Sequence, residues 1–131
     1  MPVTAISTIL STAPAPRNLT GDKAVYKGCL GTGVVKLAGD LNAGRTGLTE
    51  QQARDAGFNV ITVTCVTDDK AHYYPDASAF VTKLIADRDT HKLLGIQVLG
   101  AGAVDKMVDI AVTGIAMGAA VEDFDTMDFS Y

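Results

Sequence analysis

The sequence predicts an α+β fold, an antiparallel β-sheet with helices packed on one face. In residues 79–87, β-branched and aromatic side chains alternate with polar ones, as in a half-buried strand. Residues 87–91 form an Asp-rich turn, and residues 92–99 return as a partner strand, which makes a hairpin. After residues 100–102 a helix is predicted to lie across the hairpin, because apolar residues recur every three or four positions. These residues are Val104, Val108, Ala111, Val112, Ile115 and Ala119.

The composition is that of a soluble globular domain. The chain has 131 residues, of which 47% are hydrophobic and 20% are charged, so it is long enough for one hydrophobic core. The net charge of −4 and the lack of a Lys/Arg cluster argue against nucleic acid as a partner. Every apolar run is broken before the roughly 18 residues that a membrane span needs, so no membrane partner is expected.

The N-terminus and the cysteines predict a cytoplasmic protein. The first residues lack the basic start of a secretory signal. Cys29 and Cys65 are too few for a disulfide framework, so both thiols are expected to be reduced.

The N-terminal region divides into an arm and the start of the domain. Residues 1–20 show no sustained periodicity, and Pro14 and Pro16 would end any earlier helix, so this stretch is predicted to be a loose arm. Residues 21–131 are predicted to form the folded domain. Within it, a glycine-rich lead precedes a short strand at residues 34–38.

Residues 45–57 contain the clearest helix signals in the chain. Thr49 and Gln52 have the spacing of a capping box, and Leu48 and Ala53 that of a hydrophobic staple. Gly57 follows the helix, where a left-handed residue is common.

The stretch after this helix is rich in β-forming residues. Residues 58–67 are apolar or Thr on both faces, which predicts a strand in the centre of the sheet. Residues 71–76 are predicted to be an extended loop, because Pro75 disfavours the α conformation at Tyr74. Residues 121–124 are predicted to form a helical turn, and residues 125–131 an acidic, extended tail.

Two motifs with a chemical meaning do not fit their patterns. Residues 100–105 lie between a strand and a helix, as a dinucleotide fingerprint does, but Asp105 stands at the third glycine position and no further strand follows. The glycines of residues 28–33 precede a strand, whereas a P-loop places them between a strand and a helix. A zinc site is not favoured either, since the two cysteines are 36 residues apart and the two histidines both lie in predicted loops.

Two functional alternatives remain open from the residues alone. Cys65 or Cys29 with His72 could form a nucleophilic pair in a small thiol enzyme, although Cys65 also suits a core position. The cluster His72, Tyr73 and Tyr74 could bind a small ligand on a loop, or could simply cover the sheet edge.

Several short motifs, taken in order and spacing between residues 18 and 131, resemble one known family. The motifs are Tyr26-Lys27-Gly28, residues 43–50, Tyr73-Tyr74-Pro75, residues 102–106 and Phe129-Ser130-Tyr131. Together they look like the C-terminal dimerisation domain of the pyridine nucleotide-disulfide oxidoreductases. Within that family they most resemble the branch of NADH oxidase, NADH peroxidase and coenzyme A-disulfide reductase.

The resemblance implies a fragment with no cofactor site of its own. Members of the family carry an FAD domain, with the redox-active cysteine, and an NAD(P)H domain upstream of this segment. The parent protein would therefore pass hydride from NAD(P)H through FAD to reduce a disulfide, a peroxide or oxygen. The implied partners are a second copy, in a homodimer, and the FAD and NAD(P)H domains of the parent chain.

The resemblance also implies two catalytic residues. In the coenzyme A-disulfide reductase branch, two tyrosines of this domain reach the partner subunit's active site, and by motif they match Tyr73 and Tyr131. A phenol there could donate a hydrogen bond to a thiolate or a bound substrate. The chain departs from the family at Met107, where Arg is usual, at residues 1–17, which do not match the end of the FAD domain, and after Tyr131, where a segment at the subunit boundary is missing.

Overall fold

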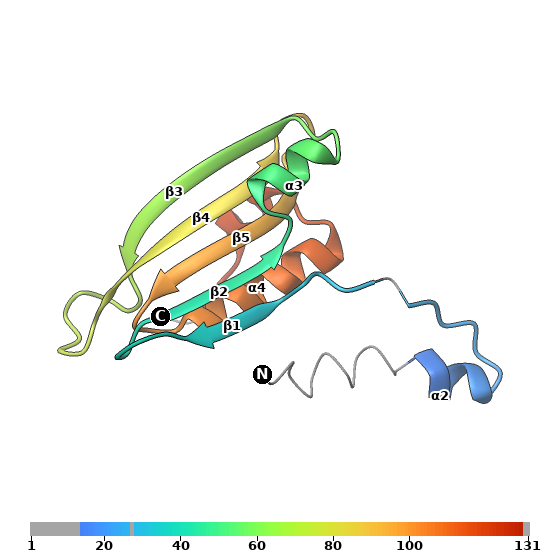
Figure 1. The fold of residues 1–131 in the computed structure, drawn as a ribbon, viewed down its shortest axis with the longest axis horizontal. Coiled ribbons are helices and arrows are strands. Elements are labelled where there is room, and N and C mark those ends of the chain that lie inside the picture. The colour runs from blue at the N-terminus through green and yellow to red at the C-terminus, as the bar shows by residue number, and fades with distance from the viewer. Residues whose placement is uncertain (1–13, 27, 130–131) are drawn as a thin grey trace. The chain divides into compact units, whose positions relative to one another are not determined.

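A computed structural model describes residues 14–26 and 28–129, and the chain divides into two compact units, Met1–Leu30 and Gly31–Tyr131 (Figure 1). The described part of the first unit contains the helix α2 (Pro14–Leu19). The second unit contains a five-stranded sheet, the helices α3 (Glu50–Asp55) and α4 (Val104–Met117) and the 3-10 helix η1 (Val121–Thr126). Among the described residues, no helix is both long and apolar enough to cross a membrane.

Helix α2 forms in a stretch that the sequence predicted to be without regular structure. Pro14 and Pro16 lie in its first turn, where backbone N–H groups have no partner within the helix, so proline costs little there. Asn18 closes the following turn, since its side chain both accepts from and donates to the backbone of Ala24, at 2.7 and 2.8 Å. The rest of the predicted arm, residues 1–13, lies outside the described residues.

The sheet confirms the predicted α+β class. Its strands are β1 (Gly33–Lys36), β2 (Asn42–Gly47), β3 (Val60–Asp68), β4 (Ala79–Asp87) and β5 (Leu93–Gly100). They pair antiparallel in the order β1-β2-β5-β4-β3. The predicted hairpin is β4–β5, which lies in the middle of the sheet.

Helix α4 covers one face of the sheet, behind the strands in Figure 1, as the apolar periodicity predicted. Val104, Val108 and Ala111 are buried against a cluster of sheet residues. The sheet residues in this core are Phe80, Leu93, Ile96 and Val98. Gly118 ends the helix in the left-handed conformation, with a φ of 71°, which glycine adopts without strain.

Helix α3 packs against the opposite face, at one end of the sheet. The predicted capping box is confirmed: the backbone N–H of Gln52 donates to Thr49 Oγ1 at 3.2 Å, and that of Thr49 to Gln52 Oε1 at 3.0 Å. Ala53 is fully buried against Val60 and Ile85, in a second small core that Leu48 also contacts. The carboxylate of Glu50 accepts from Lys83 on β4 at 2.6 Å and from Arg54 at 2.7 Å, which lowers its pKa to about 2.

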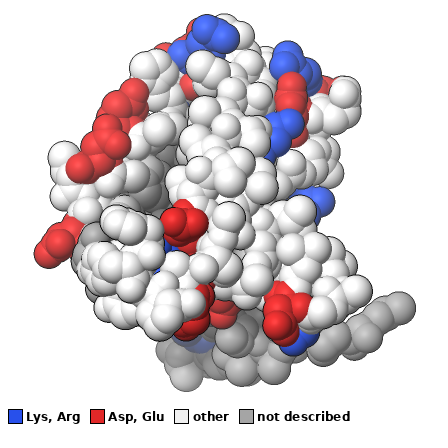
Figure 2. Space-filling model, turned by 90° about the vertical axis from the view of Figure 1, so that its left-hand side faces the viewer, with Lys and Arg blue, Asp and Glu red and all other residues white. Residues whose placement is uncertain are grey.

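The prediction that residues 58–67 form a central strand is wrong, because β3 is an edge strand. Apart from Val60, its apolar side chains are exposed instead of buried, among them Ile61 at 43%, Val63 at 50% and Val66 at 68%. Figure 2 views the side of the molecule on which β3 lies in Figure 1, and uncharged side chains occupy most of its middle. Apolar residues on both faces of a strand indicate that both faces favour burial. They do not indicate whether the strand has a neighbouring strand on one edge or on both.

Strand β2 was not predicted, because Asn-Ala-Gly-Arg-Thr-Gly lacks the residues that favour strands. Gly44 shows why this sequence is used. A Cβ at this position would lie 2.7 Å from Val104 Cγ1 and 2.8 Å from Val108 Cγ2, so the glycine allows α4 to approach the sheet closely.

Candidate functional site

The loop between β3 and β4, residues 69–78, carries the predicted site residue Tyr73. Its two ends are joined at Asp69, whose backbone N–H donates to Ser78 O at 3.0 Å and whose Oδ1 accepts from Ser78 N at 2.8 Å. One step further in, Lys70 forms an ion pair with Asp76. The Lys70 ammonium lowers the pKa of Asp76, and the Asp76 carboxylate raises the pKa of Lys70.

Between these two pairs of contacts, the chain forms turns instead of an extended segment. The backbone N–H of Tyr74 donates to Ala71 O at 2.9 Å, and that of Ala77 donates to Tyr74 O at 3.1 Å. Pro75 therefore lies inside a pair of tight turns, so the prediction of an extended loop is wrong.

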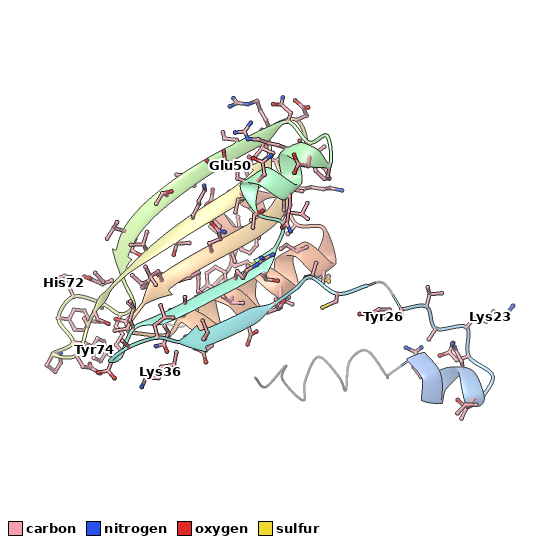
Figure 3. The ribbon with its side chains drawn as sticks, viewed as in Figure 1. Lys23, Tyr26, Lys36, Glu50, His72 and Tyr74 are labelled. Carbon is pink, nitrogen blue, oxygen red and sulfur yellow. The ribbon has the colours of Figure 1, made fainter. Side chains whose placement is uncertain are left out.

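The turns bring three aromatic rings together at the tip of the loop (Figure 3). The rings of Tyr73 and Tyr74 are stacked with their centroids 5.1 Å apart, and His72 meets Tyr73 edge-on at 5.9 Å. Tyr73 is 62% exposed. The loop therefore holds a stacked pair of phenols at the end of the sheet, where a second molecule can reach them.

The base of this loop packs against the glycine-rich turn that leads into α4. A Cβ at Gly102 would lie 1.9 Å from Asp69 Oδ2, and one at Gly100 would lie 2.3 Å from Phe80 Cβ. Both glycines are thus needed for the close approach of neighbouring side chains. The interpretation of residues 100–105 as a strand-to-helix turn is consistent with this packing.

A groove of about 420 Å³ runs between α4, η1 and the sheet. Its lining is mainly apolar and includes Phe80, Phe124 and Phe129, with Asp69 and Lys106 also in the wall. Met107, which stands where the resemblance leads one to expect Arg, lines the same groove. An apolar side chain suits this position. Tyr131, the second predicted site residue, lies outside the described residues.

The residues proposed for thiol chemistry do not form a described cluster. Cys65 is exposed on β3, and the described ring contact of His72 is with Tyr73. Cys29 belongs to the other unit of the chain. Within residues 14–26 and 28–129, no three His, Cys, Asp or Glu residues come together as metal ligands would.

Sequence reasoning did not identify the residues that hold the loop. Asp69, Lys70 and Asp76 flank the tyrosines as opposite charges, and the spacing of six residues between Lys70 and Asp76 was the signal that could have indicated an ion pair. It also did not identify the exposed apolar side chains on the sheet face opposite α4, because they depend on strand order.

Comparison with known proteins places the chain in a family. Residues 35–131 match the family described as "Pyridine nucleotide-disulphide oxidoreductase, dimerisation domain". A CoA-dependent NAD(P)H sulfur oxidoreductase from Pyrococcus furiosus is 35% identical over 117 residues, covering 89% of this chain and 26% of that protein. The chain thus spans about a quarter of the length of the curated relatives it matches.

Solved structures agree with this match. The NAD-dependent persulfide reductase from A. fulgidus has a TM-score of 0.81 and 35% identity, over 88% of this chain and 21% of the other. The reduced Bacillus anthracis CoADR-RHD has a TM-score of 0.83 and 34% identity, over 89% of this chain and 21% of the other. Relatives named NADH oxidase and coenzyme A disulfide reductase also match, which confirms the predicted branch. This chain belongs to the pyridine nucleotide-disulphide oxidoreductase family and is its dimerisation domain.

Proposed function

We propose that this chain joins two copies of a larger FAD- and NAD(P)H-dependent oxidoreductase whose substrate contains a sulfur–sulfur bond. The family description supports the first part, since the matched segment is a dimerisation domain. The second part is supported by the names of the relatives, which are a sulfur oxidoreductase in Pyrococcus furiosus and a persulfide reductase in A. fulgidus. A cytoplasmic location suits the exposed, reduced thiol of Cys65.

The two cofactors would bind in parts of the parent protein outside this chain. The described stretch that most resembles a pyrophosphate site is the turn at residues 100–102, and it is filled. The carboxylate of Asp69 lies against Gly102, and Phe80 lies against Gly100. A carboxylate at that position would repel a pyrophosphate, so the turn does not fit a dinucleotide.

In the proposed homodimer, Tyr73 and Tyr131 act on the partner subunit's active site. The observation that carries this proposal is the exposed phenol of Tyr73, held on a loop closed by the Lys70–Asp76 ion pair. When a persulfide or disulfide is reduced, the S–S bond breaks and one sulfur leaves as a thiolate. A phenol O–H can donate a hydrogen bond to that thiolate.

Hybrid dimers of the parent enzyme test this role. One subunit carries Tyr73→Phe and the other lacks the redox cysteine. If Tyr73 acts across the interface, one of the two active sites combines an intact cysteine with an intact Tyr73, so the hybrid recovers about half of the activity per dimer. If Tyr73 acts within its own subunit, neither active site is complete, and the hybrid should be no more active than the symmetric Tyr73→Phe dimer.

A matched control is available in the same aromatic stack. In the symmetric dimer, Tyr73→Phe should lower kcat by roughly 10-fold to 100-fold, since a hydrogen bond to a charged group contributes about 1.5–3 kcal/mol. Tyr74→Phe keeps the stacked rings and should leave kcat within about twofold. Equal effects of the two substitutions would assign the loop a structural role only.

A further inference from the structure

We propose that Lys70 is a positioning residue for Tyr73, which fixes the phenol in the place from which it serves the reaction. This inference rests on the proposed function of Tyr73 and identifies what holds that side chain. Lys70 lies in the loop of residues 69–78, directly after Asp69, where the two ends of the loop are joined by hydrogen bonds. We call these joined ends the base of the loop, and residues 71–77 its tip.

The tip of the loop has little hydrophobic packing to hold it. His72, Tyr73, Tyr74, Pro75 and Asp76 are exposed. Within the described part of the chain, the two clusters of buried core residues do not include them. A segment that buries little apolar surface opens easily, because few contacts are lost when it moves. Polar and aromatic contacts must therefore set the position of Tyr73.

The two turns of the tip define its backbone path but do not join it to the base. One turn is closed by the hydrogen bond from Tyr74 N–H to Ala71 O, and the next by that from Ala77 N–H to Tyr74 O. Both hydrogen bonds lie within the tip. The ion pair of Lys70 with Asp76 does connect the two parts, since Lys70 adjoins the base and Asp76 lies in the second turn.

The charges around Lys70 show that its ammonium group has more than one neighbour. The hydrogen bond with Asp76 contributes most to the raised pKa of Lys70, and the nearby Asp69 carboxylate and Tyr74 phenol add to the rise. Asp69 belongs to the base of the loop, and Tyr74 belongs to the aromatic stack. The ammonium group therefore lies between the base and the ring that stacks on Tyr73.

Tyr74 passes this constraint on to Tyr73. The two rings are stacked with their centroids 5.1 Å apart and their planes 28° from parallel. Stacked aromatic pairs attract each other beyond the area that they bury. The labelled rings of His72 and Tyr74 lie together at the tip, beyond the end of the sheet (Figure 3). A Tyr74 held by Lys70 thus restricts where the hydroxyl of Tyr73 lies.

The ion pair is too exposed to contribute much to the stability of the whole chain. The side chain of Lys70 is 39% exposed and that of Asp76 is 70% exposed, so water and salt weaken their attraction. Loss of the pair should therefore leave global unfolding nearly unchanged. It should shift the loop away from the conformation with Tyr73 in place by about three- to fivefold.

Steady-state kinetics of the parent enzyme tests the inference with Lys70→Met, which removes the charge and keeps most of the side-chain length. This variant should lower kcat about three- to fivefold and leave KM unchanged within about 1.5-fold, because Lys70 acts through Tyr73 and not on the substrate. Asp76→Asn removes the other partner and should cause the same loss. Lys70→Arg keeps the charge and should retain kcat within about 1.5-fold.

Arg54→Met is the matched control. It breaks an exposed ion pair with Glu50 on α3, at the opposite end of the sheet from the loop (Figure 3). Its kcat should stay within about 1.5-fold of wild type. Thermal unfolding of the 131-residue chain should give midpoints within about 4 °C of wild type for both Lys70→Met and Arg54→Met. A larger loss for Lys70→Met would show that Lys70 supports the whole fold, and would overturn its positioning role.

Nuclear magnetic resonance measures the position of Tyr73 without catalysis. In the wild-type chain, the stacked rings should displace each other's ring-proton signals from the values of an unfolded chain. The displacement should shrink in Lys70→Met and persist in Lys70→Arg. Ring signals of Tyr73 that remain unchanged in Lys70→Met would overturn the inference.

A second background shows whether Lys70 acts through the hydroxyl of Tyr73. In an enzyme that already carries Tyr73→Phe, adding Lys70→Met should cause no further loss of kcat, because the group that Lys70 positions is gone. Residues that act on one shared interaction are not additive in this way, whereas independent residues are.

The outcomes separate this inference from the proposed function. A kcat that Tyr73→Phe leaves unchanged would overturn the proposed role of Tyr73 and, with it, the inference. If Tyr73→Phe lowers kcat but Lys70→Met has no effect, or the same effect in both backgrounds, the inference is wrong and the role of Tyr73 stands. A KM that Lys70→Met raises in both backgrounds would show that Lys70 binds the substrate, which also overturns it. A loss of kcat only where Tyr73 is present supports the inference.

Discussion

The two faces of the sheet use similar residues in different ways. On the side of α4, Ile96 and Val98 are 2% and 3% exposed, and the helix fills the space above them. On the side of the sheet opposite α4, Leu99 follows directly in the same strand and is 41% exposed. One strand therefore contributes apolar side chains to a finished core and to an uncovered surface. Apolar residue types favour burial on both faces of this strand. Which of the two faces is buried within one chain depends on where α4 packs.

Truncation of side chains on β5 tests this difference with the largest expected effect. Ile96→Ala removes a buried side chain and should lower the free energy of unfolding by about 2–5 kcal/mol. Leu99→Ala should cost less than about 1 kcal/mol in the monomer, because Leu99 is partly exposed. Urea unfolding at low protein concentration measures both. Equal losses would show that the side of the sheet opposite α4 is already packed within one chain.

The close approach of α4 to β2 allows a second test. Gly44→Ala places a methyl group within 2.8 Å of both Val104 and Val108, so it should destabilise the chain by about 1–3 kcal/mol. Gly33→Ala on the adjoining β1 strand is the control, because a methyl group there would have no other atom within 4 Å. In a chain that already carries Val104→Ala, adding Gly44→Ala should cost less than it does in the wild-type chain. An equal cost of Gly44→Ala in the two backgrounds would rule out the contact with Val104 as its cause.

Helix α3 covers part of the side of the sheet opposite α4, and its capping box contributes to its stability. Thr49→Ala removes the acceptor for the backbone N–H of Gln52 and should cost about 1 kcal/mol. Thr64→Ala, at an exposed position of β3, serves as the control and should change the free energy of unfolding by about 0.5 kcal/mol or less. Chemical denaturation measures both, and similar losses would contradict a specific role for the cap.

The smallest effect is expected from the pH dependence of the Glu50 contacts. The pKa of Glu50 falls from 4.5 to about 2 because Lys83 and Arg54 hydrogen-bond to its carboxylate. As the pH falls through this window, the unfolded chain takes up the proton first, so the stabilisation present above pH 4.5 is lost toward pH 2. Glu50→Gln should remove this part of the pH dependence, measured as the difference between the two unfolding curves. Curves that stay parallel between about pH 5 and pH 2 would contradict the prediction.

Local signals predicted several elements well. The capping box of Thr49 and Gln52, the hairpin of β4 and β5 and the helix α4 all depend on residues close together in the sequence, and the structure confirms each of them. The resemblance to the family was also carried by short motifs, and the comparisons confirm it.

Elements whose basis lies far away in the sequence were not predicted. Glycine disfavours a strand, so Gly44 gave no signal for β2. Its presence there is explained only by Val104 and Val108 of α4, which pack directly against it. The two turns around Pro75 lie in a loop whose ends are joined by the Asp69–Ser78 hydrogen bonds, next to the pairing of β3 with β4. The role proposed for Tyr73 came from the resemblance, and its position on a closed, exposed loop came from the structure.

The sequence by itself determined α3, α4 and the β4–β5 hairpin, because capping, turn chemistry and side-chain periodicity act over a few residues. Tertiary structure alone decided that β3 lies at an edge. It also decided that a row of residues paired across all five strands lies on the side of the sheet opposite α4, namely Val35, Ala43, Leu99, Val81 and Val66. The physical reason is that the alternation of side chains shows which residues share one face of a strand. It does not show which other strands pair with that strand. Neighbours are selected by backbone hydrogen bonds and by the packing of α4 and α3, which join residues distant in the chain.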